Sequence, residues 1–160
     1  MWRMIFMPEF TGFNDCKAGQ KVKMKGKPGD GGVFVAHSIT LNSAAEEAVI
    51  ESVIQRIAYE QSALCILDHE IALPGAVTIK DLLRNKISLH GLKAGDRVKL
   101  IGKHLESGKF VPEKIKMKDP QGFNVAELQG EIDRVDCEKR ALEVLGFTVV
   151  VDERTMFYDD

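Results

Sequence analysis

The chain has 160 residues, of which 44% are hydrophobic and 29% charged, with a formal net charge of −2 at pH 7. This composition can bury a core, which excludes a wholly disordered chain. The near-neutral charge excludes attraction of the whole molecule to nucleic acid or acidic membranes, and no run of 18 apolar residues predicts a membrane-spanning helix.

The first expected elements are two strands joined by a tight turn. Lysine occupies every second position of residues 21–27, and Val22 and Met24 alternate with these lysines. One face of the strand is therefore apolar and the other basic. The glycine-rich run of residues 27–32 is interpreted as a hairpin turn, since it lacks the Gly-Lys-Ser/Thr sequence of a phosphate-binding loop.

The middle of the chain predicts one complete small barrel. Its expected elements are a strand over Val49–Tyr59, a hairpin over Ala63–Leu67 and Glu70–Leu73, a short helix over Thr78–Lys86, and a hairpin over Arg97–His104 and Lys109–Met117. Three strands, a helix and two strands is the order of the oligonucleotide/oligosaccharide-binding (OB) fold. A five- or six-stranded barrel without the helix is the alternative.

Two pairs of segments resemble each other within the chain. Cys16–Leu41 aligns without gaps on Leu92–Met117, with 11 of 26 positions identical. Ala48–Asp81 aligns on Ala126–Asp159, with 8 of 34 identical. The halves of a repeated unit therefore occur in the order second, first, second, first, which predicts an all-β protein of small α content with tandem OB-like barrels.

The order of the halves sets the expected domains. Residues 48–117 make one complete unit, residues 1–41 and 126–160 are two halves of a second, and residues 42–47 and 118–125 are linkers. The halves meet within one chain, or between chains as a swapped dimer, or the chain is part of a longer array. We favour closure within one chain, because residues 1–41 carry a net charge of +3 and residues 126–160 a net charge of −6.

A family resemblance rests on one motif and its counterpart. The motif is Leu92-Lys93-x-Gly95-Asp96-x-Val98-x-Leu100-x-Gly102 followed by Gly108-x-Phe110 and Ile115. With the segment Gly130–Asp159, it resembles a bacterial tandem repeat domain of unknown function, often found in exported proteins. The resemblance covers most of the chain and implies small OB-like β-barrels with no established catalytic residues.

The candidate ligand surface consists of the basic side chains expected on outward strand faces: Lys21, Lys23, Lys25, Lys27, Arg97, Lys99, Lys103, Lys114, Lys116 and Lys118. A basic groove on an OB barrel can follow a phosphate backbone or a glycan. None of the outward positions is aromatic, as base stacking requires, so a solvated face is favoured over a nucleic-acid groove. The repeated Gly26 and Gly102 fall on the inward side, where barrel closure explains them.

A second candidate surface is the aromatic cluster Trp2, Phe6, Phe10 and Phe13. They could line a ligand patch, but we favour core or a self-association interface, because large apolar side chains are more often buried than functional.

The three cysteines, Cys16, Cys65 and Cys137, are odd in number and lack the spacing of a disulfide framework or a metal site. Free thiols and the absence of a signal peptide favour the cytoplasm, whereas an exported protein whose signal is missing from this sequence would look the same. The four scattered histidines form no metal motif, and no nucleophile motif occurs.

These observations predict a non-catalytic β-barrel module, without metal or cofactor, that binds an unknown macromolecule or itself. The alternative is an OB-type binder of single-stranded nucleic acid or oligosaccharide, which uses the lysine-rich strand faces.

Overall fold

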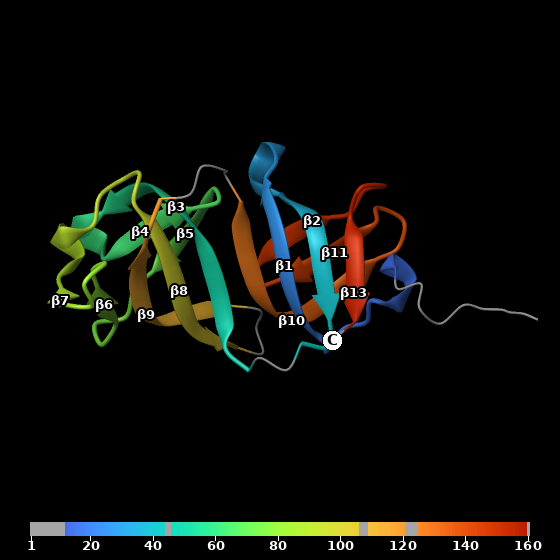
Figure 1. Cartoon of the computed structure of the whole chain (residues 1–160), viewed down its shortest axis with the longest axis horizontal. Coiled ribbons are helices and arrows are strands. Elements are labelled where there is room, and N and C mark those ends of the chain that lie inside the picture. The colour runs from blue at the N-terminus through green and yellow to red at the C-terminus, as the bar shows by residue number, and fades with distance from the viewer. Residues whose placement is uncertain (1–11, 44–45, 106–108, 121–124, 160) are drawn as a thin grey trace, which may run out of the picture.

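The computed structural model describes residues 12–43, 46–105, 109–120 and 125–159 (Figure 1). Of the described residues, 58% lie in strands and 9% in helical turns, and no helix among them reaches seven residues. The expected all-β fold is confirmed. The helical turns are of the 3-10 type: η1 (Phe13–Asp15), η2 (Asp30–Gly32), η3 (Tyr59–Gln61) and η4 (Leu89–Gly91).

The middle of the chain supplies the group of strands on the left of Figure 1. They are β3 (Ala48–Ala58), β4 (Ala63–Ile66), β5 (His69–Ala72), β6 (Thr78–Lys80), β7 (Lys86–Ile87), β8 (Arg97–His104) and β9 (Phe110–Lys118). Hydrogen bonds join them in the order β5-β4-β3-β8-β9-β6-β7. Among the described residues no ladder joins β5 to β9, so hydrogen bonds do not close this group into a ring.

The two ends of the chain together form the group on the right of Figure 1. It contains β1 (Lys21–Pro28), β2 (Phe34–Leu41), β10 (Ala126–Asp136), β11 (Ala141–Val144), β12 (Phe147–Val150) and β13 (Met156–Asp159). Ladders run from β1 through β2, β12, β11 and β10 back to β1, which closes a five-stranded barrel. We call it the composite barrel, because strands from both ends of one chain complete it.

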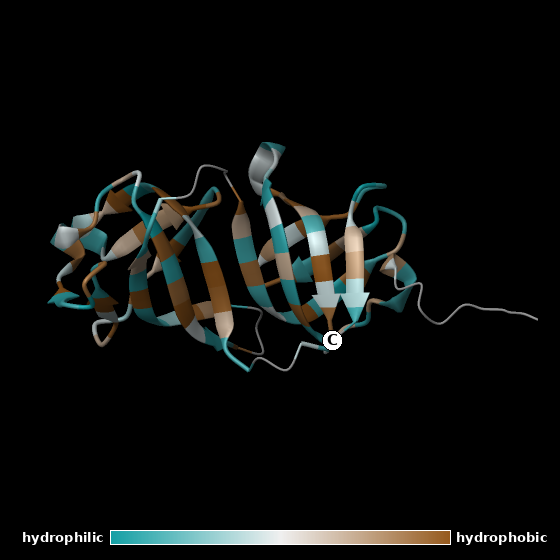
Figure 2. Cartoon of the chain, in the orientation of Figure 1, coloured by the Kyte–Doolittle hydropathy of each residue, from teal (hydrophilic) through white to brown (hydrophobic). Residues whose placement is uncertain are grey.

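Apolar and polar residues alternate along the strands, as Figure 2 shows, and the buried apolar side chains form the hydrophobic core. Val22 and Met24 of β1 are fully buried, and so are Val98 and Leu100 of β8. This agrees with the inward direction expected from the sequence, because successive side chains of a strand point to opposite faces of the sheet.

The inward glycines Gly26 and Gly102 permit a close approach between neighbouring strands. A Cβ atom at Gly26 would overlap the carbonyl oxygen of Val35, and one at Gly102 would overlap that of Val111. In both hairpins the strand register shifts at the glycine, which marks a β-bulge. Both glycines therefore serve the bending of the sheet, as the sequence predicted.

Other backbone features recur at positions that the sequence alignment pairs. Ser62 and Arg140 both adopt left-handed conformations before their hairpins, with φ of 49° and 50°. Leu67 and Leu145 do so in the turns that follow, with φ of 53° and 54°. The short strands β6 and β13 correspond in the alignment as well, and each pairs in parallel, β6 with β9 and β13 with β2.

The expected helix over Thr78–Lys86 is wrong. The alternative is right that no helix forms there, but the middle group has seven described strands, β3 to β9, whose hydrogen bonds do not close a five- or six-stranded barrel. Residues 78–80 form β6, and a turn then leads to β7. One carboxylate oxygen of Asp81 accepts hydrogen bonds from the backbone N–H groups of Leu83 (3.0 Å) and Asn85 (2.9 Å). Such a side chain offers the backbone a turn in place of a helix.

The two groups of strands are joined by direct pairing of β3 with β10. This antiparallel ladder places Ile50 opposite Leu128, two residues that the sequence alignment also pairs. The composite barrel and the middle group therefore share one continuous sheet, which runs in the order β2-β1-β10-β3-β8-β9-β6-β7.

Candidate binding face and basic groove

The lysines of β1 lie on the outer face of the composite barrel. Lys23, Lys25 and Lys27 are exposed, and Lys21 is half-buried. These positions agree with the outward direction expected from alternation. Lys25 forms a 3.8 Å ion pair with Glu127 of the neighbouring strand β10.

In the middle group of strands, β9 carries the exposed side chains of Lys114, Lys116 and Lys118. Lys99 of β8 is half-buried, and Lys103 forms a 3.7 Å ion pair with Glu113. The predicted basic residues are therefore divided between the two groups of strands, and β10 and β3 separate the two sets.

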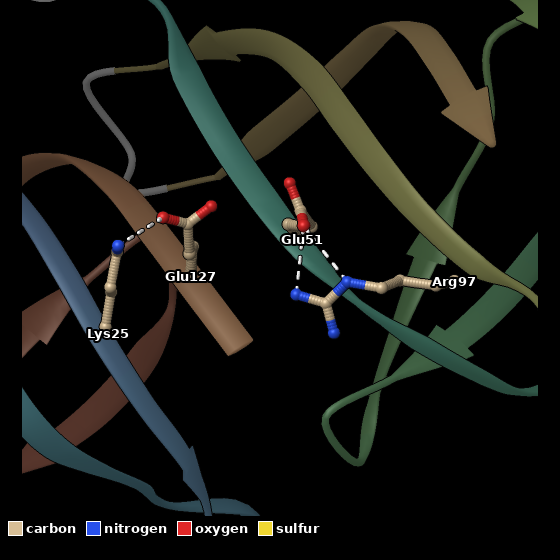
Figure 3. Close-up of polar contacts among 4 residues, drawn as sticks. All are labelled: Lys25, Glu51, Arg97 and Glu127. Atoms are coloured by element: carbon tan, nitrogen blue, oxygen red, sulfur yellow. Dashed lines mark hydrogen bonds and ion pairs between the residues drawn. The ribbon is translucent and has the colours of Figure 1, made fainter. Parts of the chain in front are cut away.

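The prediction that Arg97 faces solvent is wrong. Arg97 is only 4% exposed, and its guanidinium donates to one carboxylate oxygen of Glu51, from Nε at 3.0 Å and from Nη2 at 2.9 Å (Figure 3). Glu51 is itself only 5% exposed. Charged side chains this deeply buried are normally paired with an opposite charge. Arg97 therefore pairs with Glu51 across the β3–β8 ladder and is not available on an open surface.

A row of directly paired residues crosses the outer face of the sheet. From β1 to β7 the row reads Lys25, Glu127, Glu51, Lys99, Lys116, Lys80 and Lys86. Charges of both signs meet in its first half. Its second half contains lysine alone, and we call these four residues, Lys99, Lys116, Lys80 and Lys86, the lysine row.

The lysine row opposes sheet stability, because like charges directly opposite each other on neighbouring strands repel. Pairs of this kind change stability by about 0.2–1 kcal/mol each. Among the described residues, none of the four ammonium groups lies within ion-pair distance of a carboxylate. This part of the sheet therefore holds several positive charges that no ion pair among the described residues compensates.

A hollow of about 500 Å³ lies beside the lysine row, and we call it the basic groove. Six cationic side chains line it: Lys80, Arg84, Lys86, Lys114, Lys116 and Lys118. Two carboxylates, Asp81 and Asp119, also line it, and Asp81 already accepts two backbone hydrogen bonds in its turn. Its size is within the range of small-molecule sites, and its charge favours an anion.

Three of these cations, Lys80, Arg84 and Lys86, were not identified in the sequence. They belong to the segment where a helix was expected, and a helix would not place Lys80 beside Lys116. The parallel pairing of β6 with β9 brings these two residues together from positions far apart in the chain. The available signal was the density of cations in residues 80–86, but it did not indicate where they would lie.

Two of the four histidines, His69 and His104, make structural contacts where the two groups of strands meet. Nε2 of His69 lies 3.1 Å from the carbonyl oxygen of Gly32, and its ring packs on Phe147 with centroids 4.0 Å apart. Nε2 of His104 lies 3.0 Å from a carboxylate oxygen of Asp133 on β10. These contacts join the β4–β5 hairpin and β8 to the composite barrel and its turns.

Of the predicted aromatic cluster, only Phe13 lies within the described residues; Trp2, Phe6 and Phe10 lie outside them. Phe13 is 5% exposed and part of the core, and the Arg140 guanidinium lies over its ring at 5.3 Å from the centroid. Its ring is therefore not accessible to a ligand or to a second chain.

In the described part of the chain, no group of three or more His, Cys, Asp or Glu side chains is arranged to hold a metal ion. No helix among those residues is long and apolar enough to cross a membrane. Comparison with protein-family models, with curated proteins and with solved structures found no match to this chain. Any functional assignment therefore depends on the geometry of the lysine row and the basic groove.

Proposed function

We propose that this chain is a non-catalytic binding module of two OB-like units, and that it binds an anionic partner through the basic groove. The two-unit organisation is supported by the bulges at Gly26 and Gly102 and by the left-handed residues at aligned turn positions. Pairing of the equivalent residues Ile50 and Leu128 across the junction supports it further, because it relates the two units by approximate twofold symmetry.

One observation carries the proposed function: six cations gather around one hollow, and they come from three strands and the turn between two of them. The net charge of the whole chain is −2, so this concentration is local and not a property of the composition. A cationic hollow with low-dielectric walls concentrates anions and raises their rate of association.

Affinity for an immobilised polyanion tests this function. The protein should be retained on a heparin column and elute at a higher salt concentration than the variant Lys114→Glu/Lys118→Glu. A matched control is Lys23→Glu/Lys27→Glu, which makes the same charge change on exposed lysines of β1 and should elute with the unaltered protein. If both variants elute at equally lowered salt concentrations, heparin binds through the overall positive charge and not through the groove. If the unaltered protein is not retained even at low salt, the proposal is rejected.

Single-stranded nucleic acid is the alternative ligand, and fluorescence anisotropy of labelled oligonucleotides tests it on the same variants. Binding at physiological salt that the β9 variant abolishes would favour nucleic acid. The described residues that line the groove include no aromatic side chain for stacking bases, which weighs against this alternative.

A further inference from the structure

The lysine row is an unusual arrangement for a solvated sheet face. Neighbouring strands lie about 4.8 Å apart, so Lys99, Lys116, Lys80 and Lys86 project side by side at close spacing. Solvent-exposed sheet faces normally carry interspersed charges of both signs, as the longer row of paired residues does between β1 and β8. A bound anion with several charges would relieve the repulsion that the described residues leave uncompensated.

The spacing of the cations indicates how densely that anion must be charged. Along β9, the side chains of Lys114, Lys116 and Lys118 share one face and follow each other at about 6.6 Å. Across the strands the interval is shorter, and Arg84 lies in the turn beside the row. Cations this close in two directions form a compact cluster, which fits a ligand whose negative charges are also gathered in a small volume.

The residue types suit phosphate. Lysine presents a compact ammonium with three donors and binds phosphate as a point charge, and the planar fork of arginine binds phosphate as well as carboxylate. Arg84 is the one arginine among the described residues that line the groove. The same lining offers no aromatic side chain on which a base or a sugar ring would stack.

From these observations we infer that the lysine row and the basic groove bind a chain of directly linked phosphates. Inorganic polyphosphate and the triphosphate of a nucleotide share this chemistry. The inference rests on the proposed function, because it names the class of anion that the groove accepts.

The test is isothermal titration calorimetry of the full chain with tripolyphosphate, long-chain polyphosphate and ATP at physiological salt. The variant Lys80→Gln/Lys116→Gln removes the two central charges of the row, and Lys23→Gln/Lys27→Gln is the control with an equal charge change. We expect the row variant to weaken tripolyphosphate binding by about tenfold or more, since each of two close charge contacts is lost. The control should bind within about twofold of the unaltered protein.

A second readout needs no ligand and shows whether the row variant is folded. If the four lysines repel each other, the row variant should melt at a higher temperature than the unaltered protein, and the β1 control should not. A row variant that melts no higher than the control would overturn the argument from uncompensated charge, whatever the calorimetry shows.

Comparison of these three ligands with heparin and single-stranded DNA shows which class of anion binds. Binding of ATP and tripolyphosphate alike supports a triphosphate site, and binding of long-chain polyphosphate alone supports a polymer site. If heparin or single-stranded DNA binds while every phosphate chain fails, the proposed function stands and this inference is rejected. If no polyanion binds, both are rejected.

Discussion

The buried pair of Arg97 and Glu51 can be compared with a second pair of the same type in the same chain. The shortest N–O distances of the two pairs are similar, 2.9 Å for Arg97–Glu51 and 2.8 Å for Arg134–Glu143. Side-chain exposure differs widely, at 4% and 6% in the first pair against 71% and 43% in the second. Burial is therefore the main variable between them.

Replacing Arg97 by Met should destabilise the fold strongly, because it leaves the Glu51 carboxylate buried without its partner. Breaking a buried pair in this way costs about 3–5 kcal/mol. The same change at Arg134 removes an exposed pair worth roughly 0–1 kcal/mol. In a chain of this length 1 kcal/mol corresponds to about 2–4 °C in Tm, so the expected losses are on the order of 10 °C and a few degrees.

Urea unfolding followed by circular dichroism measures both variants. A third variant, Arg97→Met with Glu51→Leu, should recover much of the lost stability, because apolar replacement of both partners leaves no buried charge unpaired. The reasoning is refuted if Arg97→Met and Arg134→Met lie within about 1 kcal/mol of each other, since burial would then not govern the strength of the pair.

Three further predictions concern closure, packing and thiol chemistry. Light scattering should give a monomer of 17.8 kDa, because the chain ends pair with each other; a stable dimer would favour strand exchange. Gly102→Ala should cost about 1–3 kcal/mol in urea unfolding through overlap with the neighbouring strand, and Gly75→Ala, which meets no atom within 4 Å, should change little. Burial raises the pKa of the Cys16 thiol to about 11 from 9.0, so mass spectrometry after iodoacetamide at pH 8 should find exposed Cys137 modified and Cys16 unmodified. Folding stability should also fall as pH rises from 9.0 towards 11, because only the unfolded thiol then ionises; equal labelling or a flat stability profile would contradict the burial of Cys16.

Much of the fold could be predicted because strand alternation and turn glycines are local signals. The expected limits of β8 match the observed Arg97–His104, and the inward direction of Val22 and Met24 was correct. The error at Thr78–Lys86 arose because a capping threonine followed by leucines is typical of a helix. The deciding interactions are the turn hydrogen bonds of Asp81 and the parallel ladder to β9, and the ladder is not local.

The candidate site was only half predictable for the same reason. Alternation correctly predicted that Lys114, Lys116 and Lys118 are exposed, but it predicted the same for Arg97. The alternation within one strand does not show that Glu51 of another strand pairs with Arg97 and that both are buried. The lysine row depends on two further strand registers, β9 with β6 and β6 with β7, which no single segment encodes.

Closure of the composite barrel by both chain ends affects how the protein is made. During synthesis the β1–β2 hairpin leaves the ribosome before β10, the partner of β1, which follows on the order of a hundred residues later. Until then the apolar side of β1 and its open edge remain available for wrong pairing, in a nascent chain whose middle strands can already fold. We expect the lysines of β1 to act at that stage as gatekeepers that keep the unpaired edge soluble, which is a role in biogenesis rather than in ligand binding.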